Sequence, residues 1–381
     1  MIRKQKLIAG TFLSLLVSFE AFSFETTAKN AILVDYETGA YIYTKDHDKK
    51  MAPASMSKLM TLYVVFDKIK NGYLSLDDTF EVSENAWRKG GAASGSSTMF
   101  LKIGEKVKVE DLIKGIIIQS GNDACITVAE NIAGSEEDFA VLMNETAEKI
   151  GLKNSSFANS TGWPHPEHKM SAEDLAKLSK LLIEDFGEFY HLFSQKEFTH
   201  NGIKQGNRNP LLYSMESADG LKTGHTDEAG FCLAASATKN GRRLIGVMSG
   251  MNSNKERSEE AEKLINYGFR EFDNYKIFEN GDKYGTAKVW YGMTDNVDLV
   301  APYDVVQTIK RNQKNKYELK VSYKEPIKAP IKKGDKIGKI TLISPDGDKQ
   351  HFPLVANADV KQMGVFKKFM ANLKYLLLGN K

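Results

Sequence analysis

Hydrophobic residues first recur at helical spacing just after residue 55. They fall every three or four positions, as on one face of a helix: Met56, Leu59, Met60, Tyr63, Val64 and Phe66. This spacing predicts a helix from Ser55 to Lys70, which Asn71-Gly72 ends. Similar patterns predict helices over residues 112–118, 171–183 and 254–272. Asp123 is expected to cap a further helix after the turn at residues 120–122.

Shorter apolar runs predict strands between these helices. They cover residues 31–34, 41–43, 220–223, 231–238 and 244–249, and Asn240-Gly241 between the last two is a strong hairpin signal. Helices interleaved with a mainly antiparallel sheet predict an α+β domain over residues 24–275. The small polar segment 89–98 is expected to be a mobile loop, and residues 154–168 an irregular one.

The pattern changes after residue 275. Tyr317, Leu319, Val321 and Tyr323 alternate with polar residues, which predicts a half-buried strand. Turns at residues 333–335 and 345–347 enclose the apolar run 340–343. We therefore expect a small all-β domain over residues 276–360.

The two ends of the chain have distinct patterns. Residues 1–23 combine three basic residues, an apolar run over 7–19 and small residues at 21 and 23, which predicts a signal peptide. An uncleaved membrane anchor is the alternative, but the run is short for a span of about 20 residues. Residues 361–381 carry five lysines and no acid, and their apolar residues share one helical face. This pattern predicts an amphipathic helix in a membrane interface, or else one that packs on the β domain or on a partner.

Composition excludes some classes of function. The 381 residues are 41% hydrophobic and 27% charged, typical of a soluble globular protein long enough for two domains. Without residues 1–23 the formal charge of +3 falls to +1, because that segment has three bases and one acid. A nearly neutral body argues against nucleic-acid binding.

Cysteine and histidine usage indicates no metal centre. Cys125 and Cys232 lie in apolar stretches and are expected to be buried free thiols, although an exported protein could join them. There is no CxxC and no His/Cys cluster, so we expect no metal and no cofactor.

One constellation carries chemistry. Ser55 and Lys58 are three residues apart at a predicted helix start, which places a hydroxyl and an amine within hydrogen-bond reach. A serine hydroxyl becomes a good nucleophile only when a base takes its proton, and a lysine can do so if burial or another cation lowers its pKa. Lys222 could supply that cation, Ser120 could relay a proton, and Asn122 could hold a substrate amide.

Each motif alone is weak, but Ser-x-x-Lys, Ser-Gly-Asn and Lys-Thr-Gly occur here in order, at a helix start, a turn and a strand. This is the motif set of serine β-lactamases and penicillin-binding proteins. Nearly the whole chain resembles the low-molecular-mass penicillin-binding proteins that act as D-alanyl-D-alanine carboxypeptidases. The resemblance rests on residues 53–61, 83–87, 120–124 and 219–226. Ser-Gly-Asn replaces the Ser-Asp-Asn of β-lactamases, which favours the carboxypeptidases.

The resemblance implies a transpeptidase-like catalytic domain and a mechanism. Lys58 takes the proton of Ser55, Ser55 attacks the carbonyl of the penultimate D-alanine of a peptidoglycan muropeptide, and the leaving D-alanine receives a proton through Ser120. Lys222, Thr223 and Gly224 belong to the substrate-binding strand, and the backbone N–H groups of Ser55 and His225 form the oxyanion hole. β-Lactams acylate Ser55 as substrate mimics. The family also ends in an amphipathic anchor, which implies the periplasmic side of the inner membrane.

Several residues have two interpretations. Arg257 is a weaker candidate for the substrate carboxylate, or a solvated charge on a helix surface. Arg208 could equally be structural. His225 is expected to contribute only its N–H, and the histidines at 165, 168, 191 and 200 are expected to have no catalytic role.

Other functions remain open at this point. A β-lactamase usually has a glutamate that holds the deacylating water, and no Glu-x-x-Leu-Asn pattern occurs between Ser120 and Lys222. A non-catalytic envelope scaffold or penicillin sensor could keep the same motifs. A D,D-endopeptidase could use the same site.

Overall fold

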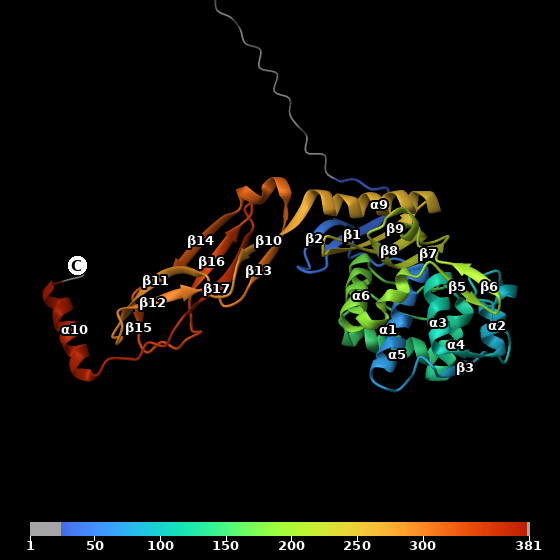
Figure 1. Cartoon of the computed structure of the whole chain (residues 1–381), viewed down its shortest axis with the longest axis horizontal. Helices are drawn as coiled ribbons and strands as arrows, with labels where there is room; N and C mark the ends of the chain where they lie inside the picture. The colour runs from blue at the N-terminus through green and yellow to red at the C-terminus, as the bar shows by residue number, and fades with distance from the viewer. Residues whose placement is uncertain (1–23, 379–381) are drawn as a thin grey trace, which may run out of the picture.

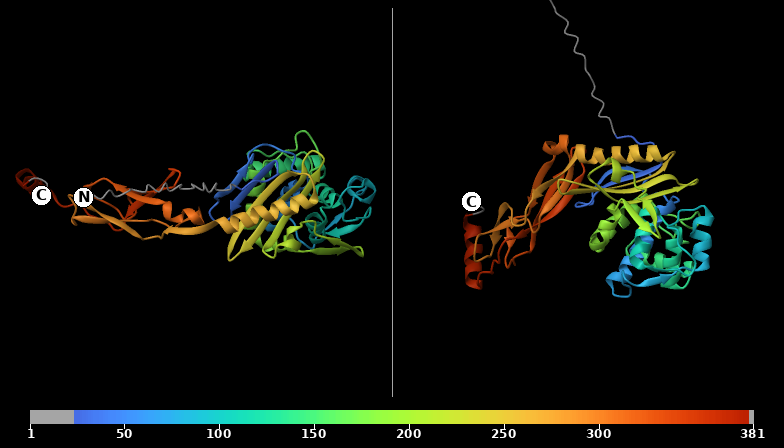
Figure 2. Two further views of the ribbon diagram at one scale, coloured as in Figure 1. Left: turned by 90° about the horizontal axis from the view of Figure 1, so that it is seen from above. Right: turned by 45° about the vertical axis from the view of Figure 1, so that its right-hand side comes forward.

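The computed structural model describes residues 24–378, in which two bodies lie end to end and a last helix lies across the far end (Figures 1 and 2). The larger body is built on a five-stranded antiparallel sheet in the order β2-β1-β9-β8-β7. Its strands are β1 (Asn30–Asp35), β2 (Tyr41–Lys45), β7 (Ala218–Thr226), β8 (Gly230–Lys239) and β9 (Arg242–Met251). The predicted signal peptide lies outside the described residues.

Both faces of this sheet are buried. Along β1, Ile32 packs with the larger core, whereas Ala31 and Leu33 pack with a second core on the other face, because successive side chains point to opposite faces of a strand. Helix α9 (Asn254–Glu271) covers the second core, and Figure 1 shows it lying across the top of the sheet.

The opposite face carries the other helices. Helix α6 (Ala172–Asp185) packs against β9, β1 and β8 of the sheet, and α1 (Lys58–Lys70) packs against α6 and α5. The remaining elements of this body are α2 (Glu84–Gly90), α3 (Val109–Lys114), α4 (Asn122–Ala133), α5 (Glu136–Lys149), α7 (Gly187–Tyr190) and α8 (Leu211–Ser214), the short helices η1 (Ala54–Ser57), η2 (Ala92–Ser94) and η4 (His191–Ser194), the π turn η3 (Gly115–Gln119), and the strand pairs β3 (Thr79–Glu81) with β4 (Lys106–Lys108) and β5 (Glu197–His200) with β6 (Ile203–Gly206).

The second body consists of strands. Strand β10 (Phe272–Phe278) continues directly from α9 and pairs with β13 (Val305–Lys310). A six-stranded sheet packs beside this pair, in the order β14 (Glu318–Tyr323), β16 (Lys336–Ile343), β17 (Lys349–Ala356), β12 (Asn296–Val300), β11 (Lys283–Trp290) and β15 (Ile327–Lys328); the short helix η5 (Arg311–Lys316) precedes β14. The α+β class and the all-β second body are therefore as predicted.

One strand prediction is wrong. Strand β14 forms where the alternation placed it, but it is exposed along its whole length rather than half-buried. Leu319 and Val321 lie opposite the buried Leu342 and Ile340 of β16, so they share the core-facing side. They stay exposed because β14 is an edge strand with one neighbour.

A buried carboxylate joins the two bodies. Asp35, at the end of β1, pairs with Arg242 of β9 at 2.8 Å and accepts a 3.1 Å hydrogen bond from Nδ2 of Asn274 on β10. Arg242 also donates to the carbonyl oxygen of Phe272, and the hydroxyls of Thr38 and Thr308 lie 2.5 Å apart. These bonds tie β1, β9 and the turn after β1 to the pair β10 and β13.

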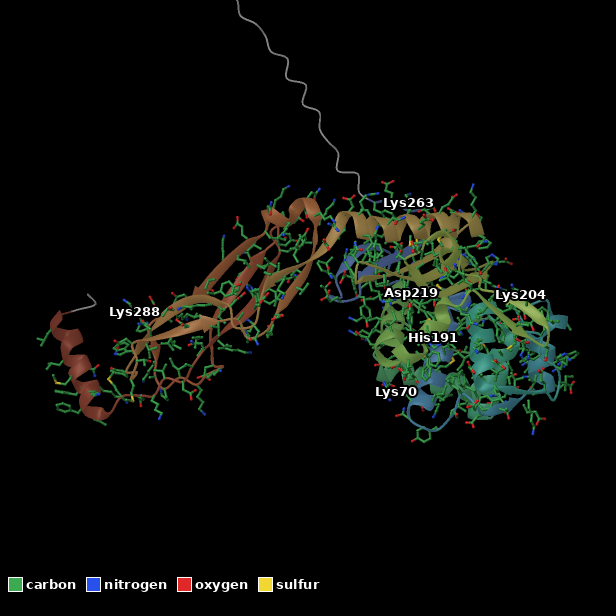
Figure 3. The ribbon with its side chains drawn as sticks, viewed as in Figure 1. Lys70, His191, Lys204, Asp219, Lys263 and Lys288 are labelled. Carbon is green, nitrogen blue, oxygen red and sulfur yellow. The ribbon has the colours of Figure 1, made fainter. Side chains whose placement is uncertain are left out.

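The last element is α10 (Val365–Leu378). In Figure 1 it stands across the end of the β body, far from the larger body. No helix within residues 24–378 is long and apolar enough to cross a membrane. Figure 3 shows that the labelled cations Lys70, Lys204, Lys263 and Lys288 are spread over both bodies rather than gathered on one face.

Candidate active site

Ser55 lies in a tight turn at the start of the long helix. The predicted helix start at Ser55 is a 3₁₀ turn over Ala54–Ser57, and α1 begins at Lys58. Oγ of Ser55 lies 2.9 Å from Nζ of Lys58, which has no exposed surface. The three-residue spacing therefore brings the predicted nucleophile and base into hydrogen-bond contact.

Lys58 has two further partners. Its Nζ lies 2.8 Å from Oδ1 of Asn122 and 2.6 Å from the carbonyl oxygen of Thr161. Burial lowers the pKa of Lys58 to about 8, and Arg208 adds to this effect. A neutral amine has two hydrogens and one lone pair, so the two carbonyl-type oxygens can take both hydrogens while the lone pair faces Ser55.

The second motif turns back between η3 and α4. Ser120 has left-handed backbone angles (φ 63°), which places its hydroxyl in the cavity beside Ser55. Its Oγ is buried and has no hydrogen-bond partner within the described part of the chain. Burying a hydroxyl without a hydrogen-bond partner costs free energy. Such groups are typical of sites that bind a ligand.

The predicted capping role of Asp123 is wrong. Helix α4 begins at Asn122 after Gly121, with no side-chain cap. The Asp123 carboxylate instead accepts hydrogen bonds from Thr98 Oγ1 and the N–H groups of Met99 and Leu101. It thereby holds the end of the loop over residues 91–101. Burial raises the pKa of Asp123, although these hydrogen bonds act to lower it.

The third motif lies on the edge strand β7. Gly224 packs against the turn of Ser55, since a Cβ at this position would lie 3.1 Å from both the Ala54 Cβ and the Pro53 oxygen. Burial, Lys58 and Arg208 hold the pKa of Lys222 well below its usual value. Thr223 is also buried. The charges of Lys58 and Lys222 therefore repel each other, and Arg208 lowers the pKa of both.

These motifs meet at one cavity of about 240 Å³. It is lined by Ser55, Ser97, Ser120, Arg208, Thr223, Gly224, His225, Phe231 and Arg257. The ring centroids of His225 and Phe231 lie 4.0 Å apart, so the imidazole forms part of an aromatic wall. Asn122, Lys58 and Lys222 lie behind this lining.

Of the two arginines, Arg257 is more buried than the sequence indicated, whereas Arg208 is exposed. Arg257 is only 6% exposed, donates to the carbonyl oxygens of Gly224 and Cys232, and leaves its Nε without a partner. Its interpretation as a solvated surface charge is therefore wrong, because α9 turns this side chain towards the sheet. Arg208 donates to the Ser97 hydroxyl at 2.5 Å. The cavity thus holds two guanidinium groups that suit a carboxylate.

The loop after α5 contributes groups that sequence reasoning missed. Its residues Ser160, Thr161 and His168 are buried. His168 Nε2 lies 2.8 Å from the Ser57 hydroxyl, and its Nδ1 accepts from the N–H of Ala158. The only signal was a run of turn-forming residues at 159–162, which does not indicate what the turn contacts.

Two buried thiols lie in the same body. Cys125 and Cys232 are both free, as the sequence indicated. Burial raises the pKa of Cys125 to about 12, so it stays a neutral thiol near Lys58 and Lys222.

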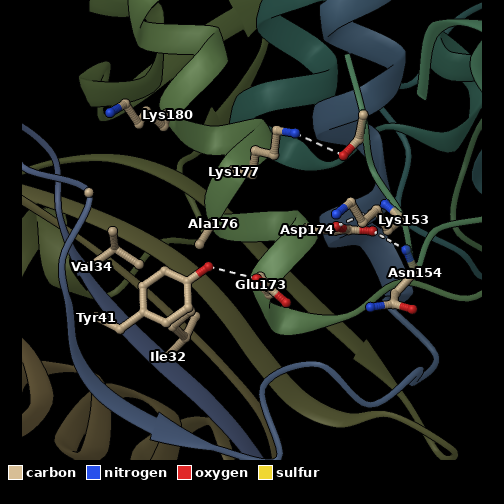
Figure 4. A pocket seen from close by; sticks show the side chains of 12 residues that line it. Ile32, Val34, Tyr41, Lys153, Asn154, Glu173, Asp174, Ala176, Lys177 and Lys180 are labelled. Atoms are coloured by element: carbon tan, nitrogen blue, oxygen red, sulfur yellow. Dashed lines mark hydrogen bonds between the residues drawn. The ribbon is translucent and has the colours of Figure 1, made fainter. Parts of the chain in front are cut away.

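A second cavity of about 330 Å³ lies between α6 and strands β1 and β2 (Figure 4). Its polar groups are largely paired with the protein. Tyr41 donates to Glu173 at 2.6 Å, Lys177 donates to the Gly151 oxygen, and Asp174 accepts from the N–H groups of Lys153 and Asn154. It does not offer the nucleophile and base found at Ser55.

Comparison with known proteins places this geometry in context. Residues 18–253 match the D-alanyl-D-alanine carboxypeptidase family model, and residues 272–362 match the model of the penicillin-binding protein 5 C-terminal domain. The chain is 41% identical over 350 residues to D-alanyl-D-alanine carboxypeptidase DacD of Escherichia coli, covering 90% of this chain and 89% of that protein.

Solved structures of penicillin-binding proteins are similar to this chain as well. Penicillin-binding protein 5 of Haemophilus influenzae superposes with a TM-score of 0.77 at 37% identity, over 89% of this chain and 99% of that one. Penicillin-binding protein D2 of Listeria monocytogenes, in an ampicillin-bound form, gives a TM-score of 0.57 at 30% identity, over 65% of this chain and 99% of that one.

Proposed function

This chain belongs to the family of serine D-alanyl-D-alanine carboxypeptidases, and we propose that it removes the terminal D-alanine of peptidoglycan stem peptides through an acyl-enzyme on Ser55. The observation that carries this proposal is the buried contact between Ser55 and Lys58, with Nζ 2.9 Å from Oγ. The pKa of Lys58 of about 8 leaves part of the lysine neutral near pH 7, as a general base requires.

In the first step, the lone pair of Lys58 takes the hydroxyl proton while Ser55 Oγ attacks the carbonyl of the penultimate D-alanine. The backbone N–H groups of Ser55 and His225 stabilise the oxyanion, a contribution of about 2.7–4 kcal/mol per donor. Because Oδ1 of Asn122 already accepts from Lys58, its amide hydrogens are the groups left for a carbonyl of the substrate.

The amide bond then breaks, and the leaving nitrogen needs a proton. Ser120 is suited to deliver it, since its buried hydroxyl lines the cavity without a protein partner. The proton that Lys58 took from Ser55 can reach the leaving nitrogen through this hydroxyl. Water then hydrolyses the ester of Ser55 and releases the shortened peptide.

The substrate's terminal carboxylate needs a donor and a positive charge. Thr223 supplies a hydroxyl on β7, and Arg257 adds a guanidinium that is already fixed by two backbone carbonyls. Because Gly224 has no side chain, β7 can lie in contact with the turn of Ser55. A β-lactam presents a comparable carbonyl and carboxylate, so it would acylate Ser55 as well.

The test measures free D-alanine released from a peptide ending in D-Ala-D-Ala. Wild type should release it, penicillin should block the release, and Ser55→Ala should abolish it. A stable penicillin adduct on Ser55 without D-alanine release would favour a sensor or scaffold. Rapid penicillin hydrolysis would favour a β-lactamase, and cleavage of cross-linked dimers would indicate an endopeptidase.

We also propose a division of labour along the chain: residues 1–23 as a cleaved signal peptide, 24–275 as the catalytic domain, 276–360 as the β domain and 361–381 as a membrane anchor. The family matches at 18–253 and 272–362 support a division near residue 275. These assignments place the enzyme on the periplasmic side of the inner membrane.

Helix α10 supports a peripheral anchor. Tyr291 donates to Asn372 at 2.5 Å, and Lys368 lies over the Tyr291 ring, so this polar side of the helix faces the β domain. The apolar side chains Val365, Phe366, Phe369, Leu376 and Leu377 are 62–85% exposed. Apolar residues flanked by lysines suit an interface with anionic lipid.

Vesicle binding tests the anchor. The full chain should sediment with anionic vesicles, less so with neutral ones or in high salt, and a chain ending at residue 362 should stay in solution. Equal sedimentation of the shortened chain would show that α10 is not the anchor. D-alanine release by both chains separates this outcome from failure of the catalytic proposal.

A further inference from the structure

The loop over residues 159–163 lies directly against the nucleophile and base. The Thr161 carbonyl oxygen is 2.6 Å from Nζ of Lys58, and the Ser160 carbonyl accepts a 2.7 Å hydrogen bond from Oγ1 of Thr61. Gly162 has φ +81°, and a Cβ there would lie 2.1 Å from the Ala54 oxygen. The base therefore receives a hydrogen-bond acceptor from the backbone of a distant loop.

Asn159 fixes this backbone from the other side. Its Oδ1 accepts from three consecutive N–H groups, those of Thr161 at 3.2 Å, Gly162 at 2.8 Å and Trp163 at 3.1 Å. It also accepts from the Thr161 hydroxyl, and its Nδ2 donates to the Trp163 carbonyl.

The planar peptide bond converts this contact into an orientation. In a trans peptide the C=O of one residue and the N–H of the next point in opposite directions. Since the N–H of Gly162 points at Asn159, the C=O of Thr161 must point away from it, towards Lys58. The same relation turns the Ser160 carbonyl towards Thr61, because the N–H of Thr161 is also bound to Asn159.

We propose that Asn159 is a positioning residue that directs the lone pair of Lys58 at Ser55. The inference rests on the proposed function, in which neutral Lys58 donates its two hydrogens to Asn122 and to the carbonyl oxygen of Thr161. If the Thr161 carbonyl turns away, one of those hydrogens is free to donate to Ser55 Oγ. The amine then donates to the hydroxyl that it must deprotonate, so the acylation step slows while the cavity keeps its shape.

The experiment separates binding from acylation. Stopped-flow acylation by a chromogenic β-lactam gives the affinity of the non-covalent complex and the acylation rate constant. Asn159→Ala should lower that rate constant at least tenfold and leave the affinity within about twofold. Asn144→Ala is the matched control, because Asn144 also holds this loop, through the N–H and C=O of Phe157, but away from Thr161.

A second variant keeps the proposal testable if Asn159→Ala folds poorly. Asn159→Asp keeps an acceptor oxygen, so it should recover most of the acylation rate at a pH high enough to deprotonate Lys58 beside the added carboxylate. The proposal is overturned if Asn159→Ala and Asn144→Ala acylate at similar rates, or if Asn159→Asp stays as slow as Asn159→Ala at every pH. Absence of acylation in wild type would instead overturn the proposed function.

Discussion

Nζ of Lys58 lies 2.9 Å from Oγ of Ser55 in a position without exposed surface. Burial is the main reason that the pKa of Lys58 falls to about 8, since the charged ammonium loses its hydration there. The base is therefore active only in the fraction of molecules that have lost this proton.

This relationship predicts the pH dependence of acylation. The second-order rate constant for acylation by a β-lactam should rise about tenfold per pH unit below pH 8 and level off above it. Measurement between pH 5.5 and 9.5 checks this limb. A rate constant that does not change between pH 6 and 8 would exclude Lys58 as the titrating base.

Ser120→Ala should lower the rate without lowering stability. Because the Ser120 hydroxyl is buried without a partner in the free protein, the substitution removes no hydrogen bond, and the free energy of unfolding should stay the same or rise by about 1–3 kcal/mol. The loss of a proton relay should lower kcat by about 10²–10⁴-fold. Chemical denaturation and D-alanine release measure the two effects. A large loss of stability with little loss of kcat would contradict the relay.

Arg257 should recognise the terminal carboxylate. Replacing it with Gln removes one charge-assisted contact, so kcat/KM for a D-Ala-D-Ala peptide should fall about 10–100-fold. The same peptide with a C-terminal amide serves as the control. Wild type should strongly prefer the free acid, and Arg257→Gln should lose this preference. If the substitution lowers kcat/KM equally for both peptides, Arg257 acts only by holding the structure of β7.

His168 should make stability depend on pH. Burial lowers its pKa from 6.5 to about 4, so between these values the unfolded chain binds a proton that the folded one does not. The free energy of unfolding should therefore decrease as the pH falls from 7 to 4, by about 3 kcal/mol from this residue.

The comparison of wild type with His168→Gln isolates this effect. Urea denaturation at pH 7, 5.5 and 4.5 should show a shallower decrease for the variant, because glutamine does not titrate. Identical slopes for the two proteins would mean that His168 is not the responsible group.

Local patterns were sufficient where a segment's own side chains decide its structure. The helical period after Ser55 and the hairpin at Asn240-Gly241 both led to the elements observed as α1, β8 and β9. The capping role of Asp123 was wrong because a loop 22 to 25 residues away supplies better donors to its carboxylate. The prediction that β14 is half-buried was wrong, because the alternation of apolar and polar residues does not reveal how many neighbouring strands a strand has.

The sequence by itself determined the chemical groups, their order and the family, since Ser55 and Lys58 sit three residues apart on one helix start whatever surrounds them. Only the tertiary structure decided how Lys58 is made a base. Its burial, its contact with Asn122 and the Thr161 carbonyl come from segments 64 and 103 residues away. Backbone carbonyls carry no residue-specific signal, and the burial of a side chain is a property of the packed whole.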